Sequence, residues 1–461
     1  MTPHLSSPHI LCVNPWIHDF AAFDFWAKPL GLLLLASILR KGGAQVTFMD
    51  CLDRFHPKSS AGAKIHKDGR GPFRKEEIPF PGELHGVKKR FSRYGIAKEW
   101  FYQDLRHINK PDLILVTSLM TYWASGVRET ISVIKDVYPD VPVVLGGIYV
   151  SLCTAHAEKN SMADHVSPGS GESVIKSLVK YYTGFSLSFS CKANDLDALP
   201  WPALDMVSRL SYAPVLTSRG CPFSCAYCAS SFLNPVFCQR SFESVFQEIQ
   251  HWYEAYNVIN FAFYDDALLI NQERFFLPLL EKIIQSGMTA AFHTPNALHI
   301  REIKQKTAEL MFQSGFKTIR LGLETADFSE ARHYDAKVKE NEFFNAVNHL
   351  KHAGFDKHNI GAYLLCGLPG QDLSEVESSI QIVKKYKITP VLAYYTPIPH
   401  TPMWEQAVEN AVFDIEKDPI FTNNALFPCL DRTTGMKSIY RLKQLAQKDK
   451  KNLNFLERIC E

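Results

Sequence analysis

The sequence lacks a long uninterrupted apolar segment. Its longest, at residues 29–39, is well short of the roughly 20 apolar residues that a membrane-spanning helix needs. The N-terminus also lacks a basic stretch followed by an apolar core and a cleavage site, so no secretory signal is expected. We therefore expect a cytoplasmic protein without a membrane span.

The sequence also lacks an excess of charge of one sign. Lys and Arg number 50 and Asp and Glu number 48, a net charge of +2 with His neutral. This balance predicts no nucleic-acid partner. The exception is a basic insert at about 54–98, which is interpreted either as a solvated loop or as a lid over an anionic substrate or cofactor.

The sequence lacks a second cluster of cysteines. The chain has 11 cysteines, an odd number, and most are scattered. This pattern argues against a disulfide framework and favours a reducing compartment. Only the cysteines between 221 and 228 are tightly grouped.

What the sequence does contain, first of all, is a regular alternation of strands and helices. Strands are expected at 9–15, 44–50, 112–119 and 141–147, and helices at 29–41, 126–137 and 171–183. Such alternation predicts right-handed βαβ units and a parallel sheet. Residues 1–185 are therefore expected to form an α/β, doubly wound, Rossmann-like domain that binds ligands at the carboxyl ends of its strands.

A Pro-rich and acidic segment at 186–213 is expected to link this domain to a second one. Strands are predicted near 213–219, 260–266, 290–296, 318–324, 359–369 and 390–399, with helices at 241–256, 272–287, 303–314, 340–353 and 373–387. About six βα units predict a partial TIM-like (β/α)6 barrel over 214–402, with its active site at the carboxyl ends of the strands. A helical C-terminal region, 403–461, should follow.

The tight cysteine group has the spacing C-x3-C-x2-C, with Cys221, Cys225 and Cys228 directly after the first strand of the second domain. Cys thiolates are the usual ligands of iron–sulfur clusters. Three protein ligands around a four-iron cube leave one iron open for chemistry. A structural zinc site needs four ligands, usually from two Cys pairs, and there is no second pair here.

This motif resembles the hallmark of the radical S-adenosylmethionine (SAM) superfamily, and the resemblance covers most of residues 196–405. It implies a 4Fe–4S cluster on the three cysteines, with SAM bound to the open iron. One electron then splits SAM, and the resulting 5′-deoxyadenosyl radical abstracts a hydrogen atom from the substrate. The cofactors carry this chemistry, while the protein orients them and excludes water.

The resemblance also implies further cofactor contacts at the strand ends. These are Tyr227 beside the cluster, Asp265 and Asp266 at the SAM amine, Glu324 at the amine or ribose, and Gly367 and Pro369 near the adenine. Alternatives stay open for several of them. An acid such as Asp266 could cap the next helix, and residues 367–370 could be only a turn. Arg240 faces either the SAM carboxylate or an acid on the following helix.

The first part of the chain resembles the cobalamin-binding domain that accompanies many radical SAM enzymes. The resemblance is carried by residues 29–50, 117–119 and 146–147, and it implies cobalamin contacts at Ser118, Gly146 and Gly147. The Asp-x-His-x-x-Gly motif, which supplies a lower axial ligand, is absent, because His18 stands in a different pattern. The domain either binds cobalamin or keeps the fold for packing or substrate capture.

These resemblances imply a radical SAM enzyme, with cobalamin-dependent methyl transfer as one outcome. The alternatives are a radical SAM enzyme without cobalamin and a non-catalytic iron–sulfur protein. The expected partners are a small-molecule or lipid-like substrate and an electron donor such as flavodoxin or ferredoxin. No residue pattern identifies a catalytic side chain.

Overall fold

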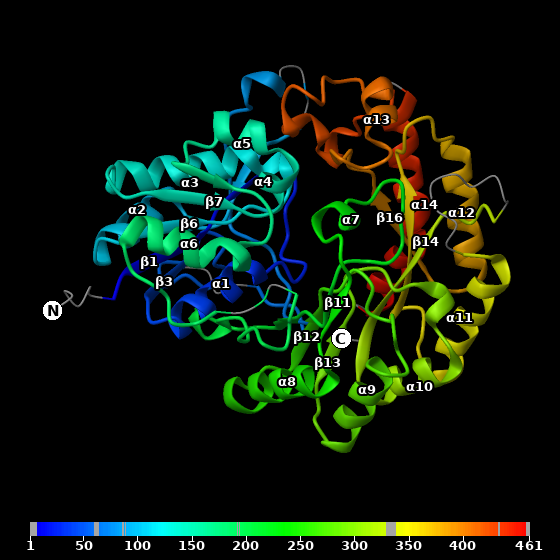
Figure 1. Ribbon diagram of the computed structural model, residues 1–461. Coiled ribbons are helices and arrows are strands. Elements are labelled where there is room, and N and C mark those ends of the chain that lie inside the picture. Colours follow the sequence, from blue (N-terminus) through cyan, green and yellow to red (C-terminus); the bar gives the residue numbers. More distant parts are fainter. Residues whose placement is uncertain are drawn as a thin grey trace.

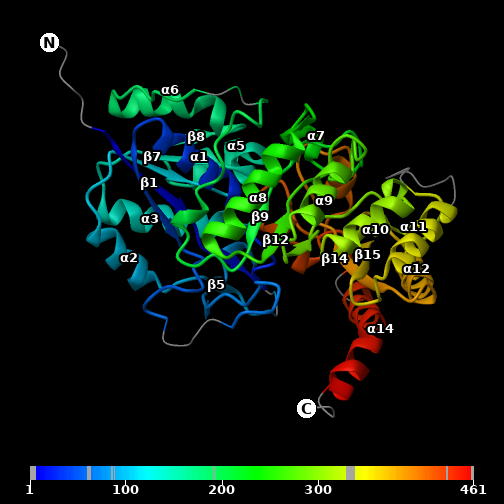
Figure 2. The same ribbon diagram turned by 90° about the horizontal axis from the view of Figure 1, so that it is seen from below.

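The computed structural model describes residues 7–457 except 60–63, 85, 86, 88, 191, 193, 329–337, 432 and 433. It contains two parallel sheets, one in each half of the chain, each with its own helices. Figure 1 shows the two halves side by side, with the short helix α7 (Ser230–Leu233) between them. The turned view of Figure 2 agrees on this position of α7.

The first sheet has five parallel strands in the order β3-β1-β6-β7-β8. The strands are β1 (His9–Asn14), β3 (Gln45–Asp50), β6 (Leu113–Val116), β7 (Val143–Gly146) and β8 (His165–Ser167). The expected Rossmann-like parallel sheet is confirmed. The prediction missed β8, which is only three residues long and begins with an exposed His165, so it shows no apolar run.

Helices cover both faces of this sheet. They are α1 (Leu30–Lys41), α2 (Lys98–His107), α3 (Ala124–Val137), α4 (Ile148–Leu152), α5 (Thr154–Asn160) and α6 (Gly171–Thr183). The apolar sides of α1 and α6 pack on one face, and those of α2 and α3 pack on the other. This layering leaves the carboxyl ends of the strands free to form a site.

The second sheet has six parallel strands in the order β16-β15-β14-β13-β12-β9. They are β9 (Ala213–Val215), β12 (Asn260–Phe263), β13 (Ala291–His293), β14 (Phe316–Glu324), β15 (Ile360–Cys366) and β16 (Thr389–Tyr394). The helices around them are α8 (Phe242–Tyr256), α9 (Phe276–Gln285), α10 (Gln305–Gln313), α11 (Glu340–Ala353) and α12 (Leu373–Lys385). Within the described residues no ladder joins β9 to β16, so the expected partial barrel is open on one side.

The basic insert is more ordered than expected. It contains β4 (Lys75–Glu77) and β5 (Ser92–Tyr94), which form a small antiparallel sheet with β2 (Ile17–Asp19). Its Phe80 and Phe91 pack in one apolar cluster with Tyr395 and Met403 from the second half of the chain. The solvated-loop interpretation is therefore wrong for this part of the insert, because it covers apolar side chains of the barrel and of the C-terminal region.

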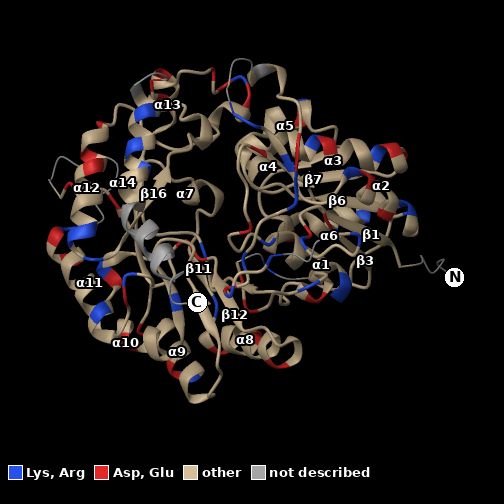
Figure 3. Cartoon of the chain, turned by 180° about the vertical axis from the view of Figure 1, so that it is seen from behind, with Lys and Arg blue, Asp and Glu red and all other residues tan. Residues whose placement is uncertain are grey.

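The C-terminal region contains α13 (Trp404–Asn410) and α14 (Thr434–Glu457), with short 3-10 turns between them. None of the helices in the described part of the chain has both the length and the apolar composition needed to cross a membrane. Figure 3 shows both acidic and basic residues on the outer helices, such as α11 and α12, as the near-zero net charge predicts.

The N-terminal half reaches into the barrel through Trp26. The indole is buried, stacks on the His293 ring at 4.7 Å between centroids, and lies 4.5 Å below the Arg70 guanidinium. Its N–H donates to the Asp68 carbonyl at 2.9 Å. On the barrel side it packs with Tyr212. The two halves are thus joined by a buried aromatic contact.

This contact predicts a pH dependence of stability. Burial lowers the pKa of His293 from 6.5 to about 4, so the folded protein keeps the ring neutral where the unfolded chain protonates it. Between these values the unfolded state binds more protons, and stability falls as the pH drops from 6.5 towards 4, by up to about 3 kcal/mol. Urea unfolding of His293→Gln should show a flatter pH profile in this window.

The exposed His358 provides the control for this measurement. His358→Gln should retain the wild-type slope. An equal slope in wild type and His293→Gln would contradict the assignment of the pH dependence to the ring beneath Trp26.

Candidate functional site

The cysteine loop is closed at its base by a short hairpin. β10 (Ser218–Arg219) pairs antiparallel with β11 (Cys238–Gln239), on either side of residues 220–237. Gly220 starts the loop with φ 82°, and a Cβ there would lie 2.9 Å from the Asn234 carbonyl oxygen. Only glycine adopts this conformation in this space without strain, so the hairpin and Gly220 together set where Cys221 begins.

The three thiols lie near enough to one another for the charge of one to affect the others. Burial raises the pKa of Cys221, and the nearby Asp266, Cys225 and Cys228 raise it further. The Ser230 amide donates to Cys228 Sγ at 3.5 Å. Hydrogen bonds to sulfur are typical of iron–sulfur ligands, and they tune the cluster's potential.

A histidine from another strand end also reaches the thiols. His299 Nε2 lies 3.9 Å from Cys221 Sγ, and its ring packs on Phe223 within the loop. No group of three His, Cys, Asp or Glu side chains in the described part of the chain is placed to hold a single metal ion. The thiols therefore fit a cluster, in which each contacts a different iron, better than they fit zinc.

The two predicted aspartates lie at the end of β12 but in different environments. The Asp265 carboxylate is buried and accepts hydrogen bonds from the hydroxyls of Thr217 and Ser218, each at 2.6 Å. Burial raises its pKa to about 6. Asp266 accepts from the Ser230 hydroxyl at 2.6 Å. Asp265 therefore ties β12 to the strand before the cysteines, while Asp266 lies beside them and caps no helix.

The other predicted SAM contacts are spread around the barrel mouth. Glu324 ends β14 in the left-handed region, with φ 65°, and is buried. Gly367 follows β15 with φ 91°, in a turn that ends at Pro369 and Gly370, and its amide donates to the Gln371 side chain at 2.8 Å. A non-glycine residue held at positive φ is strained, and such strain is common at functional sites.

Tyr227 and Arg240 contact different parts of the protein. Tyr227 is half-buried and packs, as Trp404 does, against the apolar cluster that contains Tyr395 and Met403. The Arg240 guanidinium forms an ion pair with the buried Glu248 of α8 and donates to the Leu216 carbonyl at 3.1 Å. The interpretation that Arg240 pairs with an acid on the following helix is therefore the one that the structure supports.

A cavity of about 440 Å³ lies between the two halves of the chain. Its walls come from the ends of β6, β7 and β8, from α1 and α6, from residues 196–202 and from the strand before the cysteines. Gly146, Gly147 and Asp266 line it. Ser118 supports this wall from behind, because its hydroxyl donates to the Gly146 carbonyl at 2.7 Å. A Cβ on Gly147 would lie 2.2 Å from the Ser118 oxygen.

His18 does not face this cavity. One ring nitrogen lies 3.2 Å from the Ser125 hydroxyl and the other 2.9 Å from the Glu129 carboxylate, and the ring is buried. The lining residues, all within the described part of the chain, include no His, Cys or Met. The lining is thus mostly apolar and rich in glycine, with charged side chains such as Glu172, Arg219 and Asp266 at its edge towards the cysteine loop, and it offers no imidazole as an axial ligand for cobalt.

Several residues at the site were missed from the sequence. His299 and Ser230 reach the thiols, and an ion pair between Glu172 and Arg219 crosses the cavity. His400 stacks on Phe232 of α7 at 4.2 Å. For His400 a signal existed, since it directly follows the last predicted strand, 390–399, and lies between Pro399 and Pro402. Ser230 is only two residues from Cys228, so its contact is local, whereas His299, Glu172 and Arg219 reach their partners only through tertiary contacts.

Both halves of the chain are similar to known protein families. The radical SAM superfamily matches residues 215–383, and the B12 binding domain matches residues 97–179. An uncharacterized methyltransferase of Pyrococcus horikoshii is 26% identical over 68% of this chain and 74% of its own. An anaerobic magnesium-protoporphyrin IX monomethyl ester cyclase of Cereibacter sphaeroides is 23% identical over 70% of this chain and 57% of its own.

Two solved structures share the fold. The radical SAM methyltransferase TsrM of Kitasatospora setae, with tryptophan substrate and a SAM analog bound, superposes with TM-score 0.64 at 15% identity, covering 88% of this chain and 77% of that one. The cobalamin-dependent SAM radical enzyme OxsB, with aqua-cobalamin and SAM bound, gives TM-score 0.59 at 14% identity, covering 97% and 62%.

Proposed function

Since this chain is a radical SAM enzyme with a B12-binding domain, we propose that Cys221, Cys225 and Cys228 hold its 4Fe–4S cluster and that cobalamin binds in the interdomain cavity. The observation that carries this proposal is that residues beside the cysteine loop and residues of the B12-binding half line the same cavity. Arg219 and Asp266, which flank the cysteine loop, line the same cavity as Gly146 and Gly147. A corrinoid and a cluster-bound SAM would therefore face each other.

The residues of the chain have definite tasks in this arrangement. When bound, the cluster supplies the electron that splits SAM. The Ser230 amide and His299 hold two of the thiolates by hydrogen bonds. The apolar cluster around Tyr227 and Trp404 keeps water away from one side of the loop. Asp265 holds the base of the loop in place through Thr217 and Ser218.

The proposed reaction is cobalamin-dependent methyl transfer to a small-molecule or lipid-like substrate. The name of the Pyrococcus horikoshii relative, a methyltransferase, supports it. The match to a B12 binding domain disfavours a radical SAM enzyme that works without a corrinoid. Radical SAM enzymes generally need an electron donor, and we propose a small electron-transfer protein such as flavodoxin or ferredoxin for this role.

Filling the cavity should separate corrinoid binding from SAM cleavage. Gly31 lies on α1 in the cavity wall, and a Cβ there would meet no atom within 4 Å. Gly31→Trp therefore places an indole in the cavity without straining the helix. After incubation with hydroxocobalamin and desalting, we expect at least about a tenfold loss of bound corrinoid absorbance, because the ring removes the volume that the ligand needs.

Two control variants test whether the corrinoid binds in this cavity and whether His18 is one of its ligands. Gly31→Ala should retain corrinoid because a methyl group occupies little of the cavity. His18→Ala should also retain it, since His18 is turned away from the cavity. All three variants should still form 5′-deoxyadenosine from SAM with dithionite. Corrinoid binding that survives Gly31→Trp, or that is lost in His18→Ala, would place the corrinoid elsewhere.

A further inference from the structure

One ion pair crosses the cavity and joins the two halves of the enzyme. Glu172 lies in the first turn of α6, in the B12-binding half, and its carboxylate pairs with the Arg219 guanidinium of β10. Their side chains are 7% and 19% exposed. Both residues line the cavity. The pair is thus largely shielded from water, where an ion pair is screened much less than at the surface.

Both ends of the pair are held rigidly. The Ser170 hydroxyl donates to Glu172 at 2.8 Å. Burial opposes ionisation of Glu172, but the Arg219 guanidinium, together with hydrogen bonds from the backbone and from Ser170, outweighs it and lowers the pKa of that carboxyl. On the other side, Ser218 next to Arg219 is anchored by its 2.6 Å hydrogen bond to Asp265. A displacement of α6 is therefore expected to displace β10 by a similar amount.

β10 leads directly into the cysteine loop. Arg219 is followed by Gly220, which has φ 82° and leaves no room for a Cβ, because the Asn234 carbonyl oxygen would lie 2.9 Å from it. Cys221 comes next. The position of Arg219 consequently helps to set the position of the first cluster ligand relative to the B12-binding half of the chain.

We propose that Glu172 and Arg219 are a positioning pair that sets the distance between the cluster-bound SAM and the corrinoid. The inference rests on the proposed function, because it concerns the transfer of a methyl group across the cavity. That transfer breaks the bond between the SAM methyl carbon and sulfur. It leaves the bonding pair on sulfur as S-adenosylhomocysteine, and the new bonding pair comes from reduced cobalamin. Reductive cleavage of SAM at the cluster does not cross the cavity and does not need the pair.

The first test uses hydrogen exchange and needs neither SAM nor cobalamin. In the protein with its cluster reconstituted, Glu172→Gln should raise amide exchange in residues 218–228 several-fold. The matched control is Asp205→Asn, which breaks the exposed Arg40–Asp205 pair between α1 and the start of the second half. This variant should leave exchange in 218–228 unchanged. Equal exchange in Glu172→Gln and wild type would overturn the proposal.

The second test compares two fates of SAM in samples with equal bound corrinoid. With titanium(III) citrate as reductant, Glu172→Gln should lower formation of S-adenosylhomocysteine at least about tenfold, because displacements near 1 Å can cost about 100-fold in aligned reactions. Formation of 5′-deoxyadenosine should stay within about twofold of wild type. A parallel loss of both products would indicate a damaged cluster loop and would overturn the positioning role.

Charge reversal completes the design. Glu172→Arg combined with Arg219→Glu should recover most of the S-adenosylhomocysteine formation lost in either single variant, since the pair is restored with opposite polarity. Failure of the double variant to exceed both single variants, with unchanged melting temperatures, would overturn the proposal. A wild-type enzyme that binds no corrinoid or forms no S-adenosylhomocysteine would instead refute the proposed function. The hydrogen-exchange experiment would still test whether the Glu172–Arg219 pair positions the cysteine loop.

Discussion

Simultaneous replacement of Cys221, Cys225 and Cys228 by alanine should reduce 5′-deoxyadenosine formation from SAM to background. The three thiols come from one loop and lie close enough for their charges to affect one another. Without them the cluster has no protein ligands and no open iron is held at the barrel mouth. The measurement is anaerobic reconstitution with iron and sulfide, followed by an assay for 5′-deoxyadenosine and bound iron.

Cys238 supplies the matched control. It lies on β11 at the base of the same loop, and its thiol is directed to the Val236 carbonyl at 3.8 Å. Cys238→Ala should therefore keep the bound iron and the activity. Undiminished 5′-deoxyadenosine formation in the triple variant would refute the assignment of the cluster to this loop.

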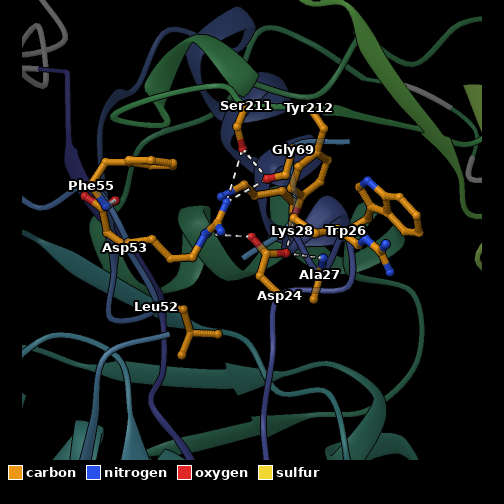
Figure 4. A network of polar contacts seen from close by, with 12 residues as sticks. Asp24, Trp26, Ala27, Lys28, Leu52, Asp53, Phe55, Gly69, Ser211 and Tyr212 are labelled. Carbon is orange, nitrogen blue, oxygen red and sulfur yellow. Dashed lines mark hydrogen bonds and ion pairs between the residues drawn. The ribbon is translucent and has the colours of Figure 1, made fainter. Parts of the chain in front are cut away.

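Replacement of Arg54 by methionine should destabilise the protein by about 3–5 kcal/mol, because it leaves the Asp24 carboxylate buried without its partner. The two side chains are 2% and 3% exposed, with Nε and Oδ2 3.1 Å apart. The Tyr212 hydroxyl donates to Asp24 at 2.7 Å and Arg54 donates to the Gly69 carbonyl at 2.7 Å. Figure 4 shows Asp24 within this network beside Gly69, Ser211 and Tyr212.

Urea unfolding would measure this effect, and an exposed ion pair provides the comparison. Lys306 and Glu281 are 3.0 Å apart with side chains 61% and 43% exposed. Lys306→Met should cost less than about 1 kcal/mol. Adding Asp24→Asn to Arg54→Met should recover part of the loss, since the buried charge is removed. Similar costs for Arg54→Met and Lys306→Met would contradict the view that burial makes the Asp24 pair sensitive.

The parts of the fold that were predictable are those whose signal lies within one segment. Strands such as β1 and β15 are continuous apolar runs, and the helix α1 ends before Gly42 and Gly43, a stop visible in the sequence. α9 is the exception. It begins at Phe276, later than the expected 272, because residues before it form turns in which Asn271 has φ 55°. Asparagine adopts the left-handed region more readily than most residues, so Asn271 was a local turn signal that the prediction overlooked.

At the candidate active site, the features set by the sequence alone can be separated from those set by the tertiary structure. By itself, the sequence determined the cysteine spacing, the strand–helix alternation of both halves and the glycines at the strand ends, because each of these depends on residues close together in the chain. Only the tertiary structure decided that Glu172 meets Arg219, that His299 reaches Cys221 and that Trp26 enters the barrel. These contacts join residues of distant segments, and no local periodicity or propensity records which distant side chains will be buried together.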